Sequence, residues 1–302
     1  MGKGRLMFFV VIVAAGAGLA SLFYIYKPKP RLDSTLAPAF QLFGHVTKGM
    51  SAALTQVMPV DSLDEKEYGE AIRLRCDSLN NPNDTDYLYV NEVMEKIKRF
   101  AKKPFQYRVY MNESGSPNAF ALPGGVIFVT RGLMTTLGSE SELVSILAHE
   151  MAHIELSHCL DTVRFELVAK KIGSESLGKL ADFTMALLLR HSFSKTQEDD
   201  ADVYAFTLLK KSTYDPAAEG KAFEAFIEYC EKNIPVKESK KAHIIRDYFM
   251  SHPPLQLRAE KFTEKGRVWW EDHHQEKRYV GKANLEKKIR KDFADGWIAG
   301  GK

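Results

Sequence analysis

Two histidines and a glutamate stand at a spacing that suits metal chemistry in the stretch SILAHEMAHIELSH, residues 145–158. His149 and His153 are four positions apart, so on a helix they lie one turn apart on the same face, where both imidazoles can bind one ion. Glu150 is displaced around the helix by one residue. This is the HExxH arrangement, in which the histidines bind Zn²⁺ and the glutamate acts as general base toward water.

The surroundings of the motif argue against a chance match. An isolated HExxH is expected in roughly one or two chains of this kind per hundred. Here the other positions of the helix are mostly apolar, and Ser139 with Glu142 forms a capping box at its start. Burying two histidines and a glutamate there without a ligand would cost on the order of several kcal/mol, which a metal offsets. We therefore expect a helix from residue 139 to about residue 160 that carries a metal site.

A catalytic zinc site needs a third protein ligand and keeps one open position. His158 follows His153 by five positions, about 140° around a helix, which points it away from the metal as a helix-end histidine or one that lies behind the ligands. Glu198 and Asp202, one helical turn apart, are the better source: one carboxylate can bind zinc while the other accepts the outer N–H of a ligand histidine. Alone, this stretch fits a solvated acidic helix start equally well. With HExxH upstream, Glu198 is the favoured ligand and Asp202 the supporting carboxylate.

The pattern along the chain predicts an α+β fold, mostly helical, with a small sheet beside the active-site helix. Helical spacing covers 61–76, 87–101, 177–190, a segment from 195 onward and 284–293, whereas 105–112 and 126–130 have the composition of short strands. The stretch between these two strands is rich in turn residues.

The N-terminus contains 21 residues without a charge, 6–26, between basic flanks. About 20 apolar residues span a bilayer, so we expect one transmembrane helix in contact with the lipid bilayer. A cleaved signal peptide is the alternative; the length of the run and the aromatic residues beyond Ala20 favour an uncleaved anchor. The short basic N-terminus favours a catalytic domain outside the cytoplasm, in a periplasm-like or mitochondrial intermembrane space, although both flanks are basic.

Charge and cysteine content exclude some partners and sites. The net charge of +3, with no basic block interleaved with aromatic residues, argues against nucleic acid as a partner. The three cysteines are far apart and form no CxxC pair, so neither a disulfide framework nor a thiolate zinc site is indicated.

Four motifs, in order, resemble the zinc metallopeptidase family M48, which includes the CAAX prenyl proteases, the HtpX heat-shock proteases and the mitochondrial overlapping-activity protease. They are NAFALPGGVIFVTRGLM (118–134), LAHEMAHIELSH (147–158), EDDAD (198–202) and SHPPLQLR (251–258). The single anchor is most similar to the BepA-like and overlapping-activity branch. The resemblance implies a gluzincin-type metallopeptidase domain over 65–262, after an anchor with its flanks (1–31) and a juxtamembrane linker (32–64). A charged extension, expected to be helical, follows over 263–302.

The resemblance also implies roles for individual residues. One zinc ion per chain would be bound by His149, His153 and Glu198, with Glu150 as the base. His252 would stabilise the oxyanion or, in a resting state, occupy the open zinc position, and Arg258 would anchor its loop or polarise the carbonyl. An exposed strand edge would bind the extended substrate backbone; its residues are Asn118, Ala119, Phe120, Ala121, Gly124 and Gly125. The alternative for that stretch is a hairpin with ordinary turn glycines.

These expectations describe a membrane-anchored zinc metalloendopeptidase that acts on unfolded or membrane-associated polypeptides, in quality control of membrane or envelope proteins. One alternative is a membrane-tethered chaperone or assembly factor with a silent or self-inhibited zinc site. A structural zinc domain is the other; it needs four closed ligands, whereas the sequence offers three and a base.

Overall fold

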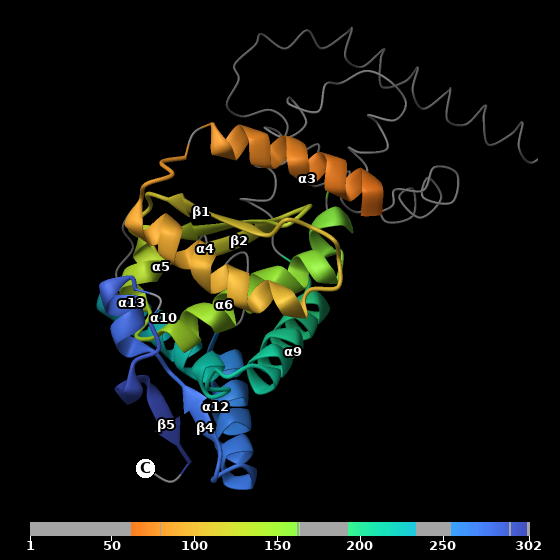
Figure 1. Ribbon diagram of the computed structural model, residues 1–302. Coiled ribbons are helices and arrows are strands. Elements are labelled where there is room, and N and C mark those ends of the chain that lie inside the picture. Colours follow the sequence, from red (N-terminus) through yellow and green to blue (C-terminus); the bar gives the residue numbers. More distant parts are fainter. Residues whose placement is uncertain are drawn as a thin grey trace, which may run out of the picture. The chain divides into compact units, whose positions relative to one another are not determined.

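The computed structural model describes residues 62–78, 80–161, 163, 193–233, 255–289 and 291–300. Within these residues the chain is mostly helical, with two small sheets (Figure 1). The elements are α3 (Ser62–Asp77), α4 (Thr85–Ile97), η1 (Lys98–Phe100), β1 (Arg108–Asn112), β2 (Ala119–Leu122), β3 (Val126–Thr130), α5 (Arg131–Thr136), α6 (Glu140–Glu155), α9 (Lys195–Lys211), α10 (Ala218–Asn233), α12 (Leu255–Asp272), β4 (Lys277–Tyr279), α13 (Lys282–Lys287), η2 (Ala294–Gly296) and β5 (Trp297–Ala299).

The main sheet has the strand order β1-β3-β2, with β1 parallel and β2 antiparallel to β3. The two strands predicted from composition correspond to β1 and β3. The third strand, β2, lies in the stretch whose composition indicated turns. Composition did not indicate a strand there because β2 has only four residues and is flanked by Pro117 and Pro123. β2 is therefore an edge strand of this sheet.

The sheet is covered on both faces. Tyr68 and Ile72 of α3 pack with Tyr110 and Leu122 on one face, while α4 and α6 pack against the other (Figure 1). α3 comes so close to the β2–β3 turn that a Cβ at Gly69 would lie 2.4 Å from the Cα of Gly124. This contact fixes α3 against the hairpin that contains the edge strand.

The predicted active-site helix is α6, and it begins as expected at Ser139, whose side chain accepts the N–H of Glu142. All residues from Glu140 to Ile154 are buried, because α6 packs against the sheet, α9 and α10. A helix buried on every side must satisfy its polar side chains internally.

Two expected boundaries are wrong. α6 ends at Glu155 instead of continuing to about 160, because Ser157 takes a left-handed conformation (φ 65°) before a new helical turn starts at His158. The helix expected over 284–293 is the six-residue α13, which ends where Lys288 also has a positive φ of 54°. The C-terminal extension is thus not purely helical: β4 and β5 pair antiparallel within it.

The predicted transmembrane segment 6–26 and the predicted helix 177–190 lie outside the described residues. Among the helices that the structure describes, none is both long and apolar enough to cross a bilayer.

Candidate metal centre

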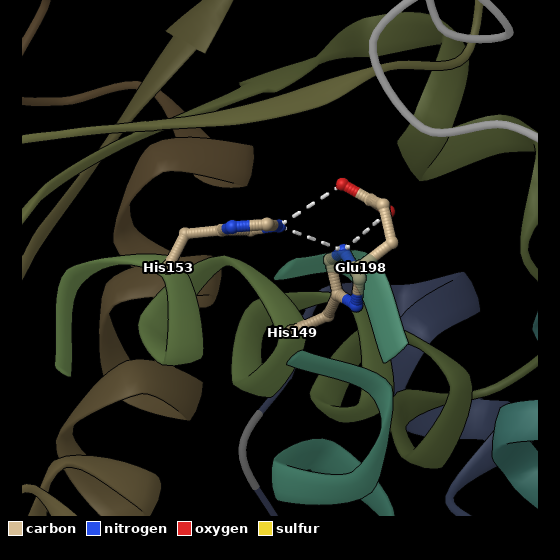
Figure 2. Close-up of side chains that lie close together, drawn as sticks. All are labelled: His149, His153 and Glu198. Carbon is tan, nitrogen blue, oxygen red and sulfur yellow. Dashed lines mark hydrogen bonds and ion pairs between the residues drawn. The ribbon is translucent and has the colours of Figure 1, made fainter. Parts of the chain in front are cut away.

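Three of the predicted ligands meet at one point between α6 and α9 (Figure 2). His149 Nε2 and His153 Nε2 are 3.2 Å apart. Glu198, in the first turn of α9, places Oε2 3.5 Å from His149 Nε2 and Oε1 3.4 Å from His153 Nε2. All three side chains are at least 97% buried, with exposed fractions of 3%, 0% and 3%. The spacing of four positions in α6 and the packing of α9 on α6 produce this cluster.

The donor set fits a zinc ion. Zinc binds histidine nitrogen and carboxylate oxygen at about 2.0–2.1 Å with tetrahedral geometry, which corresponds to ligand atoms about 3.3–3.4 Å apart. The three separations in the cluster, 3.2, 3.4 and 3.5 Å, match this requirement. Two neutral imidazoles and a carboxylate are also the ligand types that zinc prefers in catalytic sites.

The outer nitrogen of His149 contacts the second carboxylate of α9. His149 Nδ1 lies 3.0 Å from Asp202 Oδ1. Burial lowers the pKa of His149, but hydrogen bonds to Asp202 and Glu198 outweigh it and raise that pKa to about 10. Burial raises the pKa of Asp202, and the contacts with His149 and Arg258 reverse this and lower it. Asp202 is therefore a carboxylate that orients the imidazole of His149.

Arg258 lies in the first turns of α12 and is buried against the same carboxylates. Its Nε and one terminal nitrogen donate to the two oxygens of Asp202 at 3.0 and 2.6 Å, and its other terminal nitrogen lies 3.2 Å from Glu198 Oε2. Its guanidinium also stacks 4.4 Å above the ring of Phe223. These contacts favour an anchoring role for Arg258 over polarisation of a substrate carbonyl.

The outer nitrogen of His153 contacts the histidine that follows the helix. His153 Nδ1 lies 3.0 Å from Nδ1 of His158, and the ring of His153 stacks on Phe193 at 3.8 Å. The ring of His158 does not point away from the site, as it would on a straight helix, but lies against the outer side of His153. The left-handed turn at Ser157 makes the difference, since it breaks the straight helix on which the expectation was based.

Glu150 is fully buried in α6, one residue after His149. Its charge is one of the causes, after burial of the thiol, that raise the pKa of Cys159. The Cys159 thiol in turn contacts the carbonyl oxygen of Ala121 in β2 at 3.5 Å. His252 lies outside the described residues.

The predicted substrate-binding stretch forms the edge strand and its turn. The main-chain carbonyl of Asn118 accepts the N–H of Thr130 at 3.0 Å, so alternate residues of β2 pair with β3. The main-chain groups of Ala119 and Ala121 face the other side of β2, where both residues are buried and the Cys159 thiol contacts Ala121 O. The side-chain oxygen Oδ1 of Asn118 is buried and has no hydrogen-bond partner among the described residues. Gly124 and Gly125 form the β2–β3 turn with φ of 77° and 98°, so the hairpin alone explains these two glycines.

Several residues near the site carried no signal in the sequence. Lys103 lies in a loop and donates to groups at the C-terminal end of α6, including Ile154 O at 2.7 Å. Phe193 supplies the ring on which His153 stacks. Glu219 of α10 is buried with no hydrogen-bond partner for either oxygen among the described residues, and burial together with the Asp202 charge raises its pKa well above the usual value. Lys103 and Glu219 lie outside the motifs and Phe193 precedes Glu198 by five positions, so the fold is needed to show that they lie near the site.

A buried His-His-Glu cluster on two packed helices, close to the edge strand β2, defines the chain as a candidate metal-dependent hydrolase. Residues 85–265 match the model of Peptidase family M48. This match covers more than half of the chain, which therefore belongs to Peptidase family M48.

Known relatives agree with this family. The chain is 30% identical over 138 residues to the mitochondrial metalloendopeptidase OMA1 of Schizosaccharomyces pombe. The aligned region covers 43% of this chain and 41% of that protein. It is 29% identical over 174 residues to the metalloprotease LoiP of Escherichia coli, covering 54% of this chain and 63% of that protein. The Escherichia coli beta-barrel assembly-enhancing protease is 25% identical over 173 residues, 50% of this chain and 34% of that protein. The chain thus matches less than two thirds of the length of these relatives.

Proposed function

We propose that the chain is a zinc-dependent metalloendopeptidase that hydrolyses internal peptide bonds of polypeptides. The observation that carries this proposal is the convergence of His149 Nε2, His153 Nε2 and the Glu198 carboxylate at separations suited to one zinc ion. Family membership and the names of the relatives, metalloendopeptidase and metalloprotease, support the same reaction class.

A zinc ion held by these three side chains would polarise the scissile carbonyl and make water a better nucleophile. Glu150 is the general base: it takes a proton from the attacking water and delivers it to the departing amine. Asp202 keeps the His149 ring oriented, and Arg258 holds Asp202 and Glu198 in place through its three nitrogens. His252 remains proposed as an oxyanion-stabilising residue or as an occupant of the open zinc position at rest.

The edge of β2 is the proposed binding surface for the substrate backbone. The main-chain groups of Ala119 and Ala121 point away from β3, so an extended peptide that displaces the Cys159 thiol from Ala121 O can add to the sheet as a further strand. The side chain of Asn118 begins the same edge, and its buried Oδ1 is available to accept a peptide N–H. Phe120, which stacks on Phe128 at 4.9 Å, keeps the edge strand fixed on the sheet.

The membrane and biological role extend this proposal. Residues 6–26 are proposed as a single membrane anchor with the protease domain outside the cytoplasm. The proposed substrates are unfolded or membrane-associated polypeptides, and the proposed role is quality control of membrane or envelope proteins. Support comes from relatives whose names place one in mitochondria and link another to beta-barrel assembly.

The test compares wild type with Glu150→Gln, both as the full chain purified in detergent, on unfolded casein. Because Glu150 is the base and not a ligand, the variant should bind one zinc ion per chain as wild type does and lose cleavage by a factor of at least about 100. Zinc content by elemental analysis and peptide release by mass spectrometry measure the two properties separately.

A chelator-treated wild type is the matched control and should regain cleavage when zinc is restored. Full cleavage by Glu150→Gln would refute the assignment of the base. A wild type that binds zinc and suppresses casein aggregation, but cleaves nothing, would favour the membrane-tethered chaperone or assembly factor instead.

A further inference from the structure

The turn after α6 determines where His158 lies. The last hydrogen bonds of the helix run from Leu156 N to Ala152 O at 2.8 Å and from Ser157 N to Ile154 O at 3.0 Å. Ser157 then takes a left-handed conformation, which is unfavourable for a residue with a side chain. A continuous helix would place His158 about 140° away from His153. The turn brings its ring back toward the ligand histidine.

His153 is contacted on both of its ring nitrogens. Its Nε2 faces the metal cluster, 3.2 Å from His149 Nε2 and 3.4 Å from Glu198 Oε1. Its Nδ1 lies 3.0 Å from Nδ1 of His158, with the two rings at 64° to each other. Phe193 stacks on one face of the ring, so contacts at both nitrogens and on one face fix the orientation of His153.

The chemistry of a ligand histidine dictates the direction of that outer hydrogen bond. A neutral imidazole carries one proton, and a nitrogen that binds a metal must carry none. If Nε2 of His153 binds zinc, its proton is on Nδ1, and the nitrogen opposite must accept it. We propose that His158 is a positioning residue whose Nδ1 accepts the Nδ1–H of His153, which leaves Nε2 of His153 bare for zinc. This inference rests on the proposed function, because it takes His153 as a ligand.

The two ligand histidines then have different partners for the same task. A carboxylate, Asp202, orients His149 at 3.0 Å, whereas an imidazole orients His153. For His158 to accept at Nδ1, its own proton must be on Nε2. The turn that carries His158 is itself held, because Lys103 Nζ donates to Ile154 O at 2.7 Å and to Ser157 Oγ at 2.8 Å.

Two substitutions separate the acceptor from the bulk of the ring. His158→Phe keeps an aromatic ring and removes the acceptor; His158→Asn keeps an oxygen near the position of Nδ1. Zinc affinity of the full chain in detergent is measured by competition with a chromogenic chelator. Loss of an outer partner of a ligand histidine weakens metal binding by about 10- to 100-fold, so His158→Phe should lie in that range and His158→Asn should recover most of the loss.

Cys159→Ala is the matched control, since Cys159 is the next residue in the same turn and is also buried. It should bind zinc as wild type does. Wild-type zinc affinity in His158→Phe, or equal weakening by the Phe and Asn substitutions, would overturn the inference. Nitrogen-15 NMR of the zinc-loaded wild type tests it without any variant: protons on His153 Nδ1 and His158 Nε2 are expected, and a proton on His158 Nδ1 contradicts it.

Failure of this inference differs from failure of the proposed function. If wild type binds zinc and cleaves casein while His158→Phe keeps full affinity, only the role of His158 is wrong. If wild type binds no zinc at all, the proposed function fails first.

Discussion

The N-terminal end of α6 is held by main-chain groups from the C-terminal segment, whereas side-chain contacts of Lys103 and Glu155 hold its C-terminal end. At the N-terminal end, Glu140 N donates to Gly281 O at 3.2 Å and Ser141 N donates to Val280 O at 3.0 Å. The side chain of Glu140 accepts hydrogen bonds from Tyr89 at 2.8 Å and Tyr214 at 2.6 Å. Helix N–H groups that have no partner within α6 are thus satisfied by a distant part of the chain.

At the C-terminal end, Lys103 Nζ donates to Ile154 O, to Ser157 Oγ and, at 2.7 Å, to Glu65 Oε2 of α3. Glu155 adds to this end by accepting the main-chain N–H of Lys102 at 2.7 Å. A positive charge at a helix C-terminus is also favourable for the helix dipole.

A buried glutamate lies at each end of α6: Glu140 at the N-terminal end and Glu65 of α3 at the C-terminal end. The two carboxyl groups have different hydrogen-bond partners. Burial raises the pKa of Glu65 and of Glu140; an ammonium opposes the rise at Glu65, and two tyrosine hydroxyls oppose it at Glu140. Glu65, Val280 and Gly281 lie outside the family match at 85–265. Segments beyond that match therefore help to hold the helix that carries the metal cluster, and only the C-terminal end also fixes the turn of His158.

The largest effect is expected from Lys103→Met. The substitution leaves the buried Glu65 carboxyl and two acceptors of the α6 turn without their donor. Removing one partner of a buried ion pair costs about 3–5 kcal/mol, so the free energy of unfolding, measured with urea on the metal-free protein, should fall by roughly 3 kcal/mol. Zinc affinity should fall as well, because the turn that carries His158 loosens.

The double substitution Lys103→Met with Glu65→Met sharpens this prediction. With no charge left to bury, much of the lost stability should return, while the weakened zinc affinity should persist, since Ile154 O and Ser157 Oγ still lack a donor. A single variant as stable as wild type would show that the lysine does not hold this end.

A smaller, pH-dependent effect is expected from Glu140→Gln at the other end. Because burial raises the pKa of Glu140 above 4.5, the folded protein keeps this proton to higher pH than the unfolded chain does. Its contribution to stability is full below the ordinary pKa and is lost as the pH rises through the raised one. Relative to Glu140→Gln, wild type should lose stability as pH rises, and its zinc affinity should match that of the variant at each pH.

Urea unfolding at a series of pH values measures this difference. Parallel stability curves for the two proteins would mean that folding does not change the pKa of Glu140 and would contradict the prediction. A loss of zinc affinity in Glu140→Gln would erase the contrast between the two ends of α6.

Local patterns in the sequence were enough to bring together the residues of the cluster. The four-residue spacings of His149 with His153 and of Glu198 with Asp202 are helical spacings, and both pairs lie on helices whose faces meet. The mostly helical fold with a small sheet also followed from periodicity and composition.

The remainder depends on contacts that no local pattern encodes. Lys103 reaches Glu65 across 38 positions and Ile154 across 51. Ser157 adopts a left-handed conformation that its side chain does not favour, so the end of α6 and the place of His158 could not be predicted. Composition alone did not reveal the edge strand, because it is only four residues long and lies between two prolines, and it was expected from the family resemblance alone.

Zinc content of Glu198→Ala tests the central claim most directly, since Glu198 is the ligand supplied by the second helix. After dialysis against a weak chelator, wild type and Glu150→Gln should each retain one zinc ion per chain, measured by elemental analysis. Glu198→Ala, folded by circular dichroism, should retain close to none, because two histidines alone leave the site a ligand short. One zinc ion per chain in Glu198→Ala would contradict the account.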